Sequence, residues 1–133
     1  HTLTPGMRLA QRAMAGFLPQ IDWPRFKRVN VSADVKATGF HRFACRDETQ
    51  ALMWLLRRNA LATDGRVRAD AEPVAPAVSV PGLAEGRYRV TGWDTAAGRV
   101  ADESVAETRG GLLRFTPAPI GPDRAFAIRR IPA

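Results

Sequence analysis

The feature that most constrains the fold is a change in the spacing of apolar residues near residue 27. Before it, Met7, Ala10, Met14 and Phe17 recur every three or four residues, which is the spacing of one helix face. After it, apolar and polar residues alternate, and turn-forming residues recur at short intervals, as in half-buried strands. We therefore predict one N-terminal helix followed by a mainly β domain.

The helix is predicted to begin at Thr4 and to end at about Leu18. Thr4 is a suitable N-cap, and Pro5 fits the first turn because its missing N–H would have no helical partner there. Pro19 cannot continue the helix. Since one short amphipathic helix cannot bury its own apolar face, it must lie on this domain or on a partner. We assign residues 1–26 to the helix and a linker, and residues 27–133 to the β domain.

The β domain is predicted to be an antiparallel sandwich of about eight strands, immunoglobulin-like or jelly-roll-like. The expected strands are residues 28–34, 40–46, 49–57, 76–81, 86–93, 98–107, 111–116 and 124–130. Residues 49–56 are apolar on both faces, which predicts a central strand covered on both sides. A helix over 48–58 stays open as an alternative, because Leu, Met and Ala are good helix formers. Residues 58–76 form a long loop, and residues 94–98 form a turn in which Asp94 bonds the following backbone and Gly98 takes a positive φ.

Length and charge limit the classes of function. A chain of 133 residues fits one domain, which argues against a complete two-domain enzyme, and its first residue, His1, suggests a piece of a longer chain. The net charge is +7, carried by 18 Arg and only 2 Lys, and the first 30 residues hold +4 of it. The arginines are scattered rather than gathered with aromatics, and no apolar run is long enough to cross a bilayer. We expect neither a nucleic-acid partner nor a membrane partner.

Residues for catalysis or for metal binding are sparse. Cys45 is the only cysteine, so it excludes an internal disulfide, and we expect it to behave as a small buried hydrophobe. His41 lies four residues away, roughly 13 Å along a strand, which is too far for a thiolate–imidazole pair. The acids lie in turns or beside arginines, without the buried pairing that glycoside hydrolysis requires. We therefore expect no catalytic residue, no cofactor and no metal ion in this chain.

The three tryptophans have different expected roles. Trp54 lies inside an apolar run and is expected in the core, and Trp23 is expected to fill the junction between helix and sheet. Trp93 shares the polar face of its strand with Arg89, so its indole could face solvent and stack on a sugar ring, although packing under a loop is an alternative. Trp93, Asp94 and Arg89 form the candidate carbohydrate-binding site.

Several segments, in this order, carry a resemblance to a known family. They are Phe17-Leu18 leading to Ile21-Asp22-Trp23, then Ala51-Leu52-Met53-Trp54-Leu55-Leu56-Arg57-Arg58-Asn59, Val80-Pro81-Gly82-Leu83, Gly86-Arg87-Tyr88-Arg89-Val90, Trp93-Asp94-Thr95 with Gly98, and Asp123-Arg124-Ala125-Phe126-Ala127-Ile128. The chain resembles the C-terminal end of bacterial glycoside hydrolases of the cellulase-like clan, where an accessory β-sandwich follows the last helix of a (β/α)8 barrel. A similar domain is described as collagen-binding. Gly92 departs from the pattern, since such domains often carry a second aromatic there.

The resemblance implies a non-catalytic module that packs on the catalytic barrel of its parent chain and stabilises or flanks it. The catalytic glutamates of such enzymes lie at barrel strand ends, and no barrel strand is present here. The exposed apolar face of the helix would favour self-association of the isolated fragment. The alternatives are a carbohydrate-binding module that takes a polysaccharide through an exposed Trp, and a protein-interaction β-sandwich.

Overall fold

The computed structural model describes residues 16–58 and 72–132. The eight strands are β1 Val29–Asn30, β2 Phe40–Arg46, β3 Gln50–Arg57, β4 Val78–Pro81, β5 Arg87–Asp94, β6 Arg99–Arg109, β7 Leu112–Phe115 and β8 Asp123–Arg130. They match the eight predicted strands, although β1 is much shorter than expected. The predicted helix falls mostly on residues 1–15, outside the described residues; residues 16 and 17 are helical and lead into two 3-10 turns, η1 Leu18–Gln20 and η2 Trp23–Arg25.

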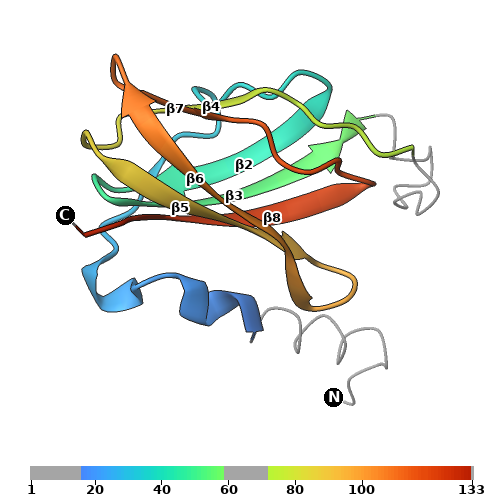
Figure 1. Ribbon diagram of the computed structural model, residues 1–133, viewed down its shortest axis with the longest axis horizontal. Helices are drawn as coiled ribbons and strands as arrows, with labels where there is room; N and C mark the ends of the chain where they lie inside the picture. The colour runs from blue at the N-terminus through green and yellow to red at the C-terminus, as the bar shows by residue number, and fades with distance from the viewer. Residues whose placement is uncertain (1–15, 59–71, 133) are drawn as a thin grey trace.

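The strands form one antiparallel sheet in the order β1-β2-β3-β8-β5-β6-β7-β4 (Figure 1). The sheet is curled, and two backbone hydrogen bonds of 3.0 Å join Lys36, between β1 and β2, to Ser79 of β4. The two ends of the strand order therefore meet. The prediction of a sandwich with two separate sheets is corrected to a single curled sheet. Alternation shows which face of each strand is buried, but not whether facing strands belong to one sheet or to two.

The inner face of the curl holds the main core. Its largest fully buried side chains are Tyr88, Phe40, Phe126, Met53 and Leu55. They come from β2, β3, β5 and β8 and pack in one cluster with residues of β4 and β7. Because strands from both ends of the sheet contribute, the core stabilises the curl itself.

The segment of residues 17–26 covers part of the outer face of the same sheet, below β5 and β8 in Figure 1. Phe17, Ile21 and Phe26 are buried there against Trp93 and Ala127. Gln50 of β3 holds this segment by a reciprocal pair of hydrogen bonds: Asp22 N–H donates to Gln50 Oε1 at 2.8 Å, and Gln50 Nε2 donates to the Asp22 carbonyl at 3.2 Å.

Residues 50–57 are a strand, so the helical alternative for 48–58 is excluded. The strand is central, because it pairs with β2 on one side and β8 on the other. Its inner face is buried, but Trp54 on its outer face is 36% exposed, so the expectation that Trp54 belongs to the core is wrong. The segment of residues 17–26 covers the outer face around Trp93 and Ala127, but it leaves Trp54 exposed.

Candidate functional site

An apolar groove of about 590 Å³ lies on the outer face of β2, β3 and β8, beside the N-terminal segment. Its floor includes Cys45, Leu52 and Ala125, which lie on the outer face of their strands. The remaining lining residues include Phe17, Phe43, Trp54 and Trp93, with Asn30, Ser32, Thr95 and Asp123 as polar neighbours. A concave surface lined mainly by apolar side chains with a few polar groups has the character of a binding site.

Two aromatic pairs contribute to the lining of the groove. Phe17 packs on Trp93 with ring centroids 6.0 Å apart and planes tilted by 56°, and Trp93 is only 6% exposed. Phe43 and Trp54, neighbours across the β2–β3 pair, are stacked at 5.2 Å with planes 27° apart. Phe43 is 53% exposed and Trp54 36% exposed. The Phe43–Trp54 pair is therefore an open aromatic surface, whereas the Phe17–Trp93 pair is closed.

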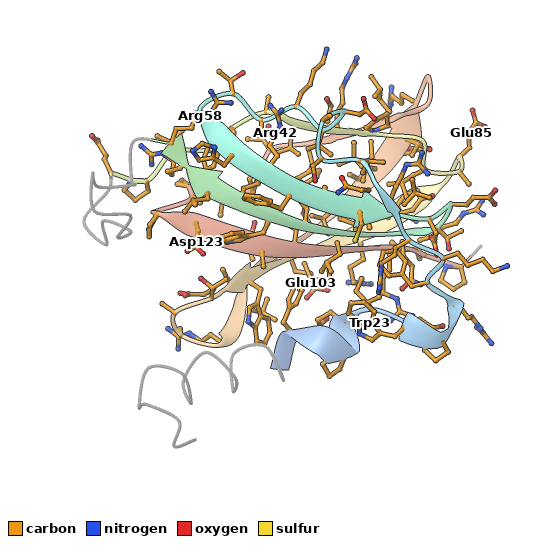
Figure 2. The ribbon with its side chains drawn as sticks, turned by 180° about the vertical axis from the view of Figure 1, so that it is seen from behind. Trp23, Arg42, Arg58, Glu85, Glu103 and Asp123 are labelled. Atoms are coloured by element: carbon orange, nitrogen blue, oxygen red, sulfur yellow. The ribbon has the colours of Figure 1, made fainter. Side chains whose placement is uncertain are left out.

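Asp123, which lies at the start of β8 (Figure 2), fixes the orientation of Trp54. The Trp54 indole Nε1 donates to Asp123 Oδ2 at 2.8 Å. The Thr95 hydroxyl, from the β5–β6 turn, donates to the same carboxylate at 2.9 to 3.0 Å. Because both donors hold one carboxylate, the exposed indole is oriented before any ligand arrives, which reduces the entropy cost of binding.

The three residues of the predicted carbohydrate site do not surround an open aromatic face. Trp93 lies on the outer face of β5, as its alternation with Arg89 predicts, but Phe17 covers it. The Asp94 carboxylate accepts hydrogen bonds from the Ala96 and Ala97 N–H groups at 3.0 and 2.9 Å and so stabilises the predicted turn. Arg89 is exposed and pairs with Glu103 of β6 at 2.6 Å.

The surroundings of Gly92 explain why this residue is small. A Cβ at this position would lie 2.0 Å from Asp102 Oδ1 and 3.1 Å from Arg124 Cδ. Asp102 Oδ2 accepts from the Ala118 N–H at 3.0 Å, and Arg124 donates to the Ala118 carbonyl at 2.9 Å. This polar cluster anchors the segment between β7 and β8 and leaves no room for a side chain on Gly92.

Phe43 and Trp54 were missed as site residues because the sequence does not reveal their pairing. Phe43 stands between Arg42 and Ala44 with no motif around it, and Trp54 lies in a run that is apolar on both faces. The register of β2 against β3 places them opposite each other. The only available signal was that both lie on the face of their strands opposite to Met53 and Ala44.

Cys45, the one cysteine of the chain, has a partly buried side chain. Burial raises the pKa of the Cys45 thiol, and nearby Arg28 offsets part of this rise, so the thiol is held in its less reactive form. Within residues 16–58 and 72–132, no group of three or more His, Cys, Asp or Glu side chains is arranged to hold a metal ion. No helix in this part of the chain is long and apolar enough to cross a membrane.

Comparisons with known protein families and with curated protein sequences give no match to this chain.

Proposed function

We propose that this chain is a non-catalytic accessory β domain of a longer protein, of the kind that follows and stabilises or flanks the catalytic barrel of bacterial glycoside hydrolases. The observation that carries the proposal is the burial of the segment 17–26 on the sheet, where Phe17, Ile21 and Phe26 are at most 9% exposed. The enzyme class comes from the sequence resemblance. The structure supports the accessory role because residues 17–26, which lead into the β domain, pack on its sheet.

The segment of residues 17–26 is held on the sheet beside the apolar groove. The two hydrogen bonds between Asp22 and Gln50 hold the segment on β3, and Phe17 both packs on Trp93 and lines the groove. Phe17, next to the first described residue, therefore shares the groove with exposed Phe43 and Trp54. Apolar side chains of a preceding domain could fill the groove, and full burial of a large apolar side chain contributes about 1.5–3 kcal/mol.

The test compares the longer protein with the isolated chain. Phe43→Ser in the longer protein should lower the melting temperature of the preceding domain by a few degrees, because about 1–2 kcal/mol of interdomain contact is lost. The same substitution should leave the isolated chain nearly unchanged, since Phe43 is already half exposed there. Val29→Ser is the matched control, because Val29 is 58% exposed but lies outside the groove. Equal melting temperatures for Phe43→Ser and Val29→Ser in the longer protein would refute the docking role.

A second candidate function, carbohydrate binding, is favoured by the exposed Phe43–Trp54 stack. Its flat surface suits the apolar face of a sugar ring, and Asp123 beside it offers a hydrogen-bond acceptor. Isothermal titration against a panel of soluble polysaccharides should then show binding that Trp54→Ala abolishes and Val29→Ala preserves. The accessory role alone predicts no heat of binding for the isolated chain. Binding that survives Trp54→Ala would exclude this surface as the sugar site.

A further inference from the structure

A row of outer-face side chains crosses the apolar groove on neighbouring strands. The register places Phe43 of β2 opposite Trp54 of β3. Ala125 of β8 lies opposite Trp54 on one side and opposite Trp93 of β5 on the other. All four residues line the groove. Two tryptophans therefore stand on either side of one alanine, and the small side chain of Ala125 leaves a slot between them.

The width of the slot suits one compact group. Neighbouring strands lie about 4.8 Å apart, so β3 and β5, on either side of β8, are separated by about 10 Å. One face of the Trp54 ring stacks on Phe43, so its other face is on the β8 side. A cation held over Ala125 would lie about 5 Å from the strand on each side, within the range of about 6 Å over which an aromatic face attracts a cation.

Asp123 supplies a negative charge at one end of the slot. It is the only charged residue among those that line the groove. None of the ion pairs among the described residues includes it. Cys45, whose thiol feels the charge of Arg28, lies about 13 Å away along the strands. An aromatic slot with an unneutralised carboxylate at its end is complementary to an organic cation.

The side-chain acceptors of the groove are already engaged. The Asp123 carboxylate accepts from the Trp54 indole and from the Thr95 hydroxyl. The Ser32 hydroxyl exchanges hydrogen bonds with the backbone of β2, and Asn30 Oδ1 accepts from the Ser32 N–H. A primary ammonium has three N–H donors, and it would leave some of them unpaired in this apolar groove, which is unfavourable. A trimethylammonium group has no N–H and avoids this penalty.

We propose that the slot between Trp54 and Trp93 binds a small organic cation that carries a trimethylammonium group, such as choline. The cation lies over Ala125 between the two indoles, with Asp123 as its counter-charge. Because Asp123 orients Trp54 before the ligand arrives, binding requires little further ordering. The proposal concerns the groove when no other domain fills it, and its test on the isolated chain does not depend on the accessory role above.

The experiment is an NMR titration of the chain with choline chloride at constant ionic strength. The control ligand is the neutral carbon analogue of choline, in which a tert-butyl group replaces trimethylammonium. Choline should shift the indole Nε1–H signals of Trp54 and Trp93 but not that of Trp23, which lies outside the groove. It should bind at least about tenfold more tightly than the neutral analogue, because the aromatic faces and Asp123 attract only the cation. No shift at millimolar choline, or equal affinity for the two ligands, would overturn the proposal.

Two variants assign the binding to the slot. Asp123→Asn removes the charge but keeps an acceptor for the Trp54 indole, so it should weaken choline at least about fivefold and change the neutral analogue less than about twofold. Asp34→Asn is the matched control, because it changes the net charge equally and Asp34 is exposed outside the groove. Ala125→Leu fills the slot without removing an aromatic ring or a charge, and it should abolish the binding of both ligands.

Three results would contradict the proposal. Equal choline affinity in Asp123→Asn and Asp34→Asn would show that the carboxylate does not attract the ligand. Choline binding that survives Ala125→Leu would show that the cation does not lie between the tryptophans. Tighter binding of a short peptide that contains trimethyl-lysine than of choline would assign the slot to a modified protein segment. If Asp123→Asn does not fold, the comparison of choline with its neutral analogue still tests the role of charge.

Discussion

Gly92→Ala is predicted to destabilise the fold through one identified clash. The new Cβ would lie 2.0 Å from Asp102 Oδ1, while Asp102 Oδ2 is held by the Ala118 N–H at 3.0 Å. The carboxylate cannot move away and keep this hydrogen bond. Its movement would also separate it from Arg124, whose Nη1 lies 3.9 Å from Asp102 Oδ1 and whose side chain is only 13% exposed.

The expected cost is the balance of three effects. Loss of a hydrogen bond to a charged group costs about 1.5–3 kcal/mol. A buried arginine with its carboxylate displaced costs on the order of 1 kcal/mol more. Alanine restricts the unfolded chain more than glycine does, and this stabilises the folded state by about 0.4–1 kcal/mol. The gain applies here because Gly92 does not need a positive φ. The free energy of unfolding should therefore fall by about 1.5–3.6 kcal/mol.

Urea denaturation, monitored by tryptophan fluorescence, measures this change in the free energy of unfolding. A double-mutant cycle identifies its cause. In an Asp102→Ala background the clash is gone, so Gly92→Ala should be neutral or slightly stabilising. Gly98→Ala is the matched control: Gly98 has φ +70°, so its cost arises from backbone strain and should be the same in both backgrounds. An equal cost of Gly92→Ala with and without Asp102, or a cost below about 0.5 kcal/mol, would refute the reasoning.

Three further predictions concern the core and the titrating groups. Leu55→Ala should lower the free energy of unfolding by about 2–5 kcal/mol in the same assay, because Leu55 is fully buried in the main core; a cost near zero would place it outside that core. Burial raises the pKa of the Tyr88 phenol, so the folded state holds its proton more tightly than the unfolded state, and stability should be lost as pH rises above about 10. Tyr88→Phe should show a smaller loss over that range, and an identical pH profile would contradict the assignment. Burial also raises the pKa of Cys45, so at pH 8 its thiol should react with an aromatic disulfide reagent at least about tenfold more slowly than in guanidinium, whereas equal rates would show that it is accessible.

The local features of the fold could be predicted from the sequence. All eight strands were located, because alternation and turn residues depend on neighbours along the chain. The turn at residues 94–98 was predicted together with the features that stabilise it. Both the Asp94 side-chain hydrogen bonds and the positive φ of Gly98 are present. The position of Trp93 on the outer face of its strand was also predictable.

Which of Trp54 and Trp93 is exposed could not be predicted from local sequence patterns. Trp93 was considered for exposure and is buried, while Trp54 was assigned to the core and is partly exposed. Both lie on the outer face of the sheet, and only the path of the segment 17–26 decides which is covered. That path depends on Phe17 meeting Trp93 and on Gln50 meeting Asp22, contacts between residues far apart in the chain.

The sequence by itself determined that this chain is mainly β, where its strands lie and which side of most strands is apolar, because these properties follow from a period of two residues. The tertiary structure decided that the strands form one curled sheet and that Phe43 and Trp54 stack beside an apolar groove. Each of these depends on strand order and register. Both are set by the packing of residues distant in sequence, and one step in register would move every side chain of a strand to the other face.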